Sequence, residues 1–398
     1  MRQITKWIKK QLVTSKALYF DHVGVCLAVL LFGWLFVLLS EKIGLFDPIK
    51  AAFDDFFLTD VYYEMLHSAS PDEDEDIVII DMTSLTTRDD ISKVITEIKT
   101  CAPKVLCIDL LFERQSFDLT DDIALINSLQ MGDCQQVLPC KLRAYDKDDG
   151  VFKDCLYSFV YKYDEHNILK WGYSNYHQVR LGGCSRETSI YQQLGDSVVY
   201  SLPYIVACLF QDRKFQKEDV NERLIMYEDV DFRTIKSDCV RQNADKLKGK
   251  IIILGTIAEE ADMHFTPLGK MPGVKVVAYS IRTYLKGGEI KWLGNSYSLL
   301  IAVLLWIIAA WLDYRIEQRH PIMFAVLAKI CNFFIGAGLV WLSFELYCRY
   351  NCNINLLYPL LGLAIVEDVR EMYSSVIKWL QEKTGWIVFK KSLYAKKE

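Results

Sequence analysis

Long apolar runs near both ends of the chain constrain its fold more than any other feature. The first run covers residues 23–39, and the later ones cover residues 298–312, 322–347 and 354–366. A helix needs roughly 20 mostly apolar residues to cross a bilayer, so we expect four transmembrane helices, the last of them short and interrupted by Pro359. Hydrophobic residues make up 52% of the 398 residues and charged residues 24%, which predicts a folded aqueous domain between the spans.

The positive charges beside these runs predict the orientation of the chain. Lysine and arginine favour the cytoplasmic side of a membrane, and they gather in residues 1–22, 313–321 and 367–398. We therefore expect both termini in the cytoplasm and residues 40–297 outside. The first run is longer than a signal-peptide core and is followed by Ser-Glu-Lys, with no small-residue cleavage site. It is therefore expected to remain as a membrane anchor.

The external part alternates between strand and helix patterns. Short continuous apolar runs predict buried strands in DIVIIDM, KVLCIDLLF and KLKGKIIILGT. Helical spacing predicts helices in ISKVITEIKTC, LTDDIALINSLQ and GVKVVAYSIRTYLKGG. Strands that alternate with helices are typical of a parallel sheet covered on both faces. The predicted fold class is therefore an α/β external domain with a largely parallel sheet flanked by helices, joined to transmembrane α-helices.

Several shorter stretches lead to local predictions. Thr87, Asp89 and Asp90 are placed to cap the first predicted helix, and Thr120 or Asp121 to cap the second. The stretch SVVYSLPYIVACLF resembles a helix with an apolar face, although residues 140–245 are otherwise less regular. The acidic run SPDEDED, just before the first strand, predicts a solvated linker.

Charge and cysteine usage narrow the range of partners. The net charge is -5 and no long basic run lies in the external part, so nucleic acid is not an expected partner. No cysteine or histidine group has zinc spacing, and we expect neither a metal nor a cofactor. Eight cysteines lie in the external part, where disulfides are permitted. Two candidate bridges are Cys134 with Cys140 and Cys155 with Cys184.

The candidate ligand site lies where predicted strands end. Asp81 and Asp109 end two strands, and the loop after Gly255 carries Asp262 and His264. Ligands usually bind at the carboxyl ends of parallel strands, so these side chains could hold a cation, a sugar hydroxyl or an amine, or perform acid–base chemistry. The alternative is that the aspartates fasten strand-to-helix turns by accepting backbone hydrogen bonds.

The rest of that loop is rich in turn residues. Thr266 is a further candidate ligand contact, and Pro267 after it holds it extended. Met271 precedes Pro272-Gly273, which marks a tight turn into the last helix of the domain. No nucleophile elbow, phosphate-binding loop or metalloprotease motif is found in the sequence, so the chain is not expected to be an enzyme.

These residues carry a family resemblance. The order is KGKIIILG, then an aspartate, then Thr-Pro, then MPGV leading into an alanine-containing helix, supplied here by Asp262, Thr266, Pro267, Met271, Pro272, Gly273 and Ala278. This pattern resembles the type-2 CHASE domain, an extracellular sensor module associated with cyclases and histidine kinases. The strands with Asp81 and Asp109 and the turn DKDDGV also look like family features, but Phe152 and Lys153 stand where the family's usual arginine is expected.

The resemblance implies a multi-pass sensor of a bacterial inner membrane with a periplasmic ligand of unknown identity. Gly255, Pro267, Met271, Pro272 and Gly273 would then be structural residues of the motif. Family members often continue into an output enzyme, but only about 30 residues follow the last run, too few for such a domain. The resemblance therefore points to a stand-alone form that passes its signal to a separate cytoplasmic partner.

The C-terminal tail has two interpretations. Apolar residues at Val366, Val369, Tyr373, Val376 and Leu380 follow heptad spacing, which favours a short homodimer or partner-docking helix. Tryptophans and a phenylalanine among the lysines instead favour a helix on the lipid surface; they are Trp379, Trp386 and Phe389.

Two further functions remain open at this point. One is a structural or assembly protein of an envelope complex. The other is an external enzyme that uses Asp81, Asp109 and His264.

Overall fold

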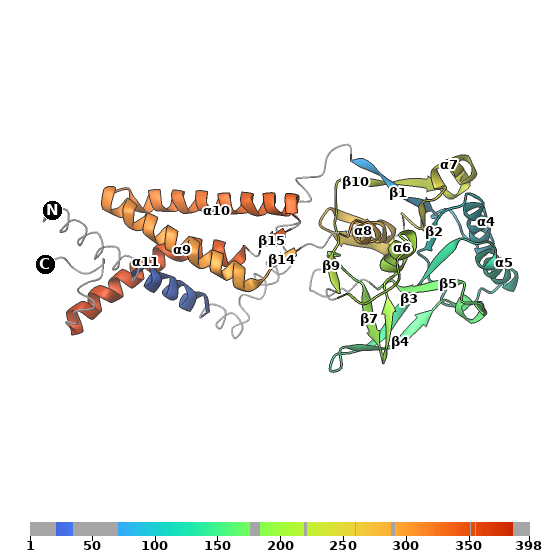
Figure 1. The fold of residues 1–398 in the computed structure, drawn as a ribbon, viewed down its shortest axis with the longest axis horizontal. Coiled ribbons are helices and arrows are strands. Elements are labelled where there is room, and N and C mark those ends of the chain that lie inside the picture. Colours follow the sequence, from blue (N-terminus) through green and yellow to red (C-terminus); the bar gives the residue numbers. More distant parts are fainter. Residues whose placement is uncertain are drawn as a thin grey trace. The chain divides into compact units, whose positions relative to one another are not determined.

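The structure, a computed structural model, describes residues 21–34, 71–175, 184–218, 221–258, 260–287, 291–350, 352–354 and 356–384. The chain divides into two compact units (Figure 1). One unit is residues 51–289, and the other combines residues 1–50 with residues 290–398. Trp386 and Phe389 of the tail lie outside the described residues.

The larger unit is built on a nine-stranded mixed sheet in the order β10-β1-β11-β2-β3-β4-β7-β8, with β5 also paired to β3. All pairs are parallel except β3–β4 and β7–β8. The predicted parallel α/β sheet is therefore confirmed in its main part. The strands are β1 (Asp72–Asp81), β2 (Val105–Ile108), β3 (Gln135–Asp146), β4 (Val151–Tyr157), β5 (Leu169–Tyr173), β7 (Tyr191–Leu194), β8 (Ser197–Tyr200), β10 (Val230–Lys236) and β11 (Ile251–Gly255).

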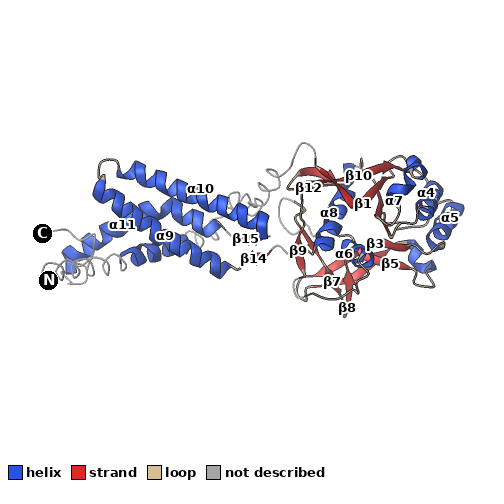
Figure 2. Ribbon diagram, turned by 45° about the horizontal axis from the view of Figure 1, so that its top comes forward, coloured by secondary structure: helices blue, strands red, loops and turns tan. Residues whose placement is uncertain are grey.

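Helices flank this sheet (Figure 2). Two of them, α4 (Arg88–Thr100) and α5 (Leu119–Gln130), share one core with alternate strand residues such as Ile80, Leu106 and Ile252, which are fully buried. The side chains of the intervening strand residues point to the other face of the sheet, which α6 (Leu202–Phe210) and α8 (Gly273–Lys286) cover. Burial of each such side chain stabilises the fold by about 1.5–3 kcal/mol.

Short elements connect these layers. They are α7 (Ala244–Leu247), β6 (Glu187–Ser189) paired with β9 (Glu222–Leu224), and several 3-10 turns: Phe159–Tyr163, Ser237–Cys239 and Arg241–Asn243.

Two helix starts differ from the sequence prediction. Of the three candidate caps of α4, Thr87 is the N-cap, since its side chain accepts a hydrogen bond from the Asp90 amide, while Asp89 and Asp90 lie in the first turn. The cap of α5 is Asp118 rather than Thr120 or Asp121, because its carboxylate accepts the Thr120 amide at 2.9 Å. The stretch SVVYSLPYIVACLF is not one helix. Its β-branched start pairs as β8, and α6 begins at Leu202.

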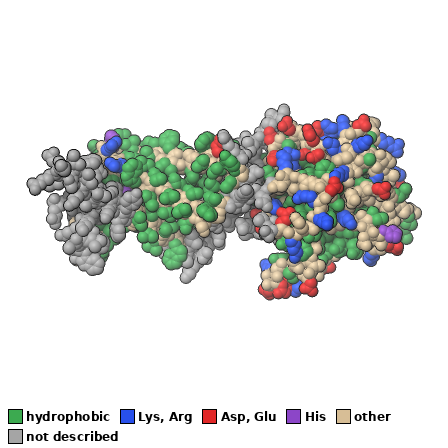
Figure 3. All heavy atoms as spheres, viewed as in Figure 1, with side chains coloured by type: hydrophobic (Ala, Val, Ile, Leu, Met, Phe, Trp, Pro, Cys, Tyr) green, Lys and Arg blue, Asp and Glu red, His purple; other side chains and the backbone are tan. Residues whose placement is uncertain are grey.

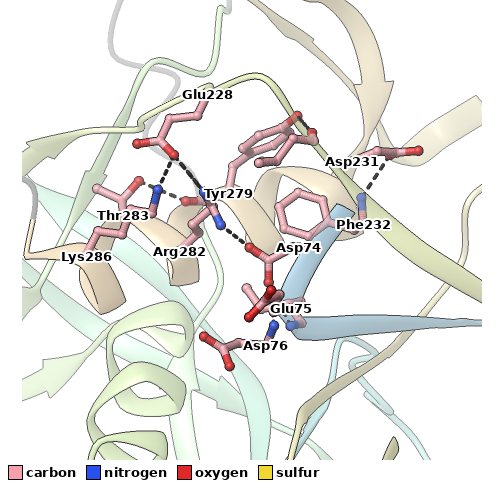
Figure 4. Close-up of polar contacts among 12 residues, drawn as sticks. Asp74, Glu75, Asp76, Glu228, Asp231, Phe232, Tyr279, Arg282, Thr283 and Lys286 are labelled. Atoms are coloured by element: carbon pink, nitrogen blue, oxygen red, sulfur yellow. Dashed lines mark hydrogen bonds and ion pairs between the residues drawn. The ribbon is translucent and has the colours of Figure 1, made fainter. Parts of the chain in front are cut away.

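The acidic run SPDEDED is not a solvated linker but enters β1. The Asp74 carboxylate is buried; it accepts the amides of Asp76 and Ile77 at 2.9 Å and forms an ion pair with Arg282 of α8. Arg282 also pairs with Glu228 at 2.7 Å, which Lys286 contacts at 2.5 Å (Figure 4). Burial raises the pKa of Glu228, but hydrogen bonds from Lys286 and Arg282 outweigh this and leave it below its usual value.

Neither candidate disulfide forms. Cys134 and Cys140 lie six residues apart along one extended segment, a separation of about 20 Å that no disulfide spans. Cys155 instead packs beside Cys140 from the neighbouring strand β4, while the backbone of Cys184 bridges to Phe265. All eleven cysteines in the described part of the chain are free thiols.

The smaller unit is a helical bundle with an apolar face in Figure 3. It contains a helix at Asp21–Trp34, α9 (Asn295–Arg319), α10 (Phe324–Tyr350) and α11 (Leu357–Thr384), with β14 (Lys291–Leu293) paired to β15 (Cys352–Ile354). Two helical stretches, Ser296–Arg319 and Phe324–Leu346, are long and apolar enough to cross a membrane. Of the predicted fourth span, residues 354–366, the part from Leu357 onward continues into the tail as the single helix α11, whereas Ile354 ends β15.

The tail helix packs into this bundle through the first three residues of its heptad seam. Val366, Val369 and Tyr373 belong to a cluster with Val25 of the first helix and Trp306 of α9. Further along α11, Val376 is exposed. The first part of the seam therefore serves packing within the chain.

A buried polar group also lies inside the bundle. Arg370 of α11 is 3% exposed, pairs with Glu317 of α9 at 2.6 Å and lies over the Phe324 ring of α10. Asp313 of α9 is completely buried and interacts electrostatically with Arg370.

Candidate functional site

The candidate site is a cavity at the carboxyl end of strand β2. Asp109 follows this strand directly, and its amide donates to the Leu254 carbonyl of β11 at 2.9 Å. Strand β2 lies between β11 and β3, so Asp109 stands at the middle of the sheet edge where parallel strands end.

The loop after β11 returns over this edge and enters α8. A short turn, η4 (Glu260–Asp262), leads into a hairpin of β12 (Met263–Thr266) and β13 (Gly269–Pro272), and α8 begins at Gly273. A Cβ atom on Gly273 would lie 2.6 Å from Oδ2 of Asp262. The Asp262 carboxylate therefore lies against the helix N-terminus, where negative charge is favoured, and any larger residue at position 273 would displace it.

These elements enclose a cavity of about 580 Å³. This volume lies within the usual range of roughly 300–1,000 Å³ for small-molecule sites. Its charged and polar lining residues come from the segment after β2, from β3, from the residues after β5, from the segment before β6 and from the loop that leads to α8. They are Asp109, Glu113, Lys141, Ser174, Asn175, Ser185, Asp262 and His264.

The electrostatics of the cavity centre on Asp109. Burial raises the pKa of its carboxyl to about 7; the Asp262 carboxylate adds to the rise and His264 opposes it. Nε2 of His264 lies 3.5 Å from Oδ1 of Asp262. Within the described ranges, no hydrogen bond reaches the Asp109 side chain. The cavity thus presents a carboxyl group that titrates near neutral pH.

The structure brings Asp109, Asp262 and His264 together but leaves Asp81 aside. The Asp81 carboxylate accepts the amide and hydroxyl of Thr83, at 2.9 and 2.6 Å. It fastens the turn after β1, as the structural alternative predicted, and Asp81 is not among the residues that line the cavity.

The other motif residues build the hairpin and the helix start. The Thr266 hydroxyl donates to the Gly269 carbonyl at 2.7 Å and accepts the Leu268 amide, so it holds the turn that contains Pro267. Met271 pairs with His264 across the hairpin, and Pro272 is the N-cap of α8.

Gly255 ends β11 beneath the start of α8. A Cβ atom there would lie 2.9 Å from the Val274 side chain, so Gly255 allows helix and strand to pack closely.

Lys141 and Asn175 were missed by the sequence reasoning. Lys141 lies on β3 beyond the end of β2. The Asn175 side chain accepts a hydrogen bond from the Leu142 amide at 2.8 Å and donates one to the Leu142 carbonyl at 2.9 Å. The sequence did offer one indication of Lys141, because it is a charged residue that follows the apolar stretch VLPC of a predicted strand.

Comparison with known proteins identifies the family of the chain. The chain combines an α/β domain that contains a ligand-sized cavity with a set of apolar helices. A model of the CHASE2 domain family matches residues 26–312, and the chain belongs to this family of extracellular sensor domains. No curated protein and no solved structure matches the chain.

Proposed function

We propose that this chain is a membrane-anchored extracytoplasmic sensor subunit that binds a small ligand in the cavity at Asp109. The observation that carries the proposal is that cavity: in a sensor-family domain, it gathers Asp109, Asp262 and His264 at the sheet edge where ligands bind α/β folds. The role is binding rather than catalysis.

The proposed topology follows from the charge distribution and the apolar helices. Four spans, with both termini in the cytoplasm of a bacterial cell and the large domain in the periplasm, fit the lysine and arginine pattern. The exposed apolar side chains of α9 and α10, among them Leu300, Leu304, Phe333 and Phe334, would contact lipid.

The signal would pass through the bundle to a separate cytoplasmic partner. Arg370 ties the tail helix α11 to Glu317 of α9, and buried charges within membrane helices usually serve function. Beyond this contact, α11 exposes Met372, Val376 and Trp379, an apolar surface suited to docking. A ligand changes the balance between two conformations of the chain only if it binds one of them more tightly than the other.

The test uses the full chain in lipid nanodiscs. Compounds from a periplasmic metabolite library are screened by thermal shift on the wild type, on Asp109→Asn and on the matched control Asp148→Asn, which changes an exposed turn carboxylate. The proposal expects a compound that stabilises wild type and control but not Asp109→Asn. The same compound should alter hydrogen exchange of α11 residues 374–384.

Other outcomes separate the alternatives. If a compound binds but exchange in α11 does not change, the domain binds without signalling through this helix, and an envelope scaffold is favoured. If Asp109→Asn abolishes turnover of a compound by the wild type, the domain is an enzyme. Failure of every compound to bind contradicts the cavity as a sensing site.

A further inference from the structure

We infer that the cavity selects a small zwitterion of the amino-acid type, with its ammonium group at Asp109 and Asp262 and its carboxylate at Lys141. This rests on the proposed function, in which the cavity is the ligand site. The inference comes from the separation of charge within the cavity wall.

The acidic end is formed by two carboxylates from different elements. Asp109 directly follows β2 and Asp262 lies in η4, and the Asp262 carboxylate contributes to the raised pKa of Asp109. A bound cation relieves their mutual repulsion, and an ammonium group offers three hydrogen-bond donors to share between them. A metal ion fits less well, because the described residues contain no group of three or more ligating side chains that could hold one.

The basic end follows from the register of neighbouring strands. Cys107 of β2 lies opposite Val137 of β3, so Asp109 lies level with Pro139, and Lys141 is two residues further on the same face. Two residues of strand span about 7 Å. Neighbouring strands lie about 4.8 Å apart, so the Cα atoms of Asp109 and Lys141 are roughly 8 Å apart. The flexible side chain of Lys141 can therefore place its ammonium group at the distance that a ligand with an ammonium and a carboxylate on a short carbon chain requires.

The ammonium group of Lys141 is free for this role. It makes no ion pair or hydrogen bond within the part of the chain that the structure describes. The other nearby carboxylate, Glu113, is 3.8 Å from Arg143. A simple amine would leave Lys141 unused, and an uncharged sugar would leave both ends unpaired.

The experiment measures binding to the full chain in nanodiscs by isothermal titration calorimetry. The zwitterionic probes are glycine, β-alanine and γ-aminobutyrate; propylamine and propionate each carry one of the two charged groups. The variants are Asp109→Asn and Lys141→Gln, with Asp148→Asn and Lys147→Gln as exposed controls in the β3–β4 turn.

We expect at least one zwitterion to bind and each single-charge analogue to bind about 10-fold more weakly or worse. Asp109→Asn and Lys141→Gln should each weaken the zwitterion by about 10-fold, and the controls should not. Affinity should fall about 10-fold from pH 8 to pH 6, because the ammonium binds ionised Asp109 and the carboxyl titrates near pH 7. The other charged or titratable groups that line the cavity are Asp262, Glu113, Lys141 and His264.

Two results would overturn the inference. Propylamine binding as tightly as the zwitterions, with Lys141→Gln silent, would show an amine site, and the sensor proposal would stand. No binding of any probe at millimolar concentration would also overturn it, while a hit in the wider compound screen would preserve the sensor proposal. Because Lys141 is exposed, its variant keeps the test valid even if Asp109→Asn fails to fold.

Discussion

Asp109→Asn is expected to stabilise the folded chain at neutral and alkaline pH, although it damages the proposed site. The pKa of Asp109 rises from an ordinary 3.8 to about 7, and each pKa unit corresponds to about 1.36 kcal/mol. Ionised Asp109 thus costs the folded state about 4 kcal/mol at most. Since the side chain is partly exposed beside an open cavity, solvent screening reduces this to about 2 kcal/mol. Asparagine keeps the shape and removes the charge.

The stabilising effect of Asp109→Asn should depend on pH. The folded carboxyl holds its proton to higher pH than the unfolded one, so its contribution to stability is fully present below about pH 4 and is lost as the pH rises through about 7. Asparagine does not titrate. The advantage of the variant over the wild type should therefore grow from pH 4 to pH 7 and become constant above it.

The assay is the thermal midpoint of the full chain in nanodiscs, followed by tryptophan fluorescence at pH 5, 6, 7 and 8. For a domain of this size, 1 kcal/mol shifts the midpoint by roughly 2–4 °C, so the variant should gain about 4 °C more at pH 8 than at pH 5. Asp148→Asn should show no such trend. If Asp109→Asn is less stable by the same amount at every pH, Asp109 is a structural turn residue and the reasoning is refuted.

Two further predictions concern packing. Arg282→Met should lower the free energy of unfolding of the larger unit by about 3 kcal/mol, measured by chemical denaturation, because it leaves the Asp74 carboxylate buried without its cation. The control Arg233→Gln, at a partly exposed ion pair, should lower it by less than about 1 kcal/mol, and equal losses for the two variants would contradict the prediction. Gly362→Val should disrupt the helical bundle, because even a Cβ atom would lie 1.9 Å from the Trp306 ring; a normal yield of monodisperse protein in detergent would contradict this close packing.

Part of the candidate site could be predicted from sequence because its residues follow strand ends. Asp109 comes directly after a buried apolar run, and Asp262 and His264 follow another. In parallel strands these positions meet at one edge, whatever the details of the loops. Asp81 also lies at this edge, opposite Gly255, but it does not line the cavity, and its carboxylate accepts a hydrogen bond from the Thr83 amide.

The parts that sequence reasoning missed depend on contacts between distant residues. Asp74 is buried because Arg282, 208 residues later, reaches it from α8. Lys141 joins the cavity because β3 pairs with β2 and then continues beyond it. Nothing near either residue in the chain indicates these partners.

The sequence by itself determined the alternation of buried strands and helices, the family and the long apolar helices, since these follow from side-chain periodicity and composition over neighbouring residues. Only the tertiary structure decided which strands are neighbours, and therefore which charges share the cavity. It also decided that the first part of the tail seam packs inside the bundle, where Val366 is fully buried. Such outcomes depend on long-range packing, in which one register places every charge along a strand.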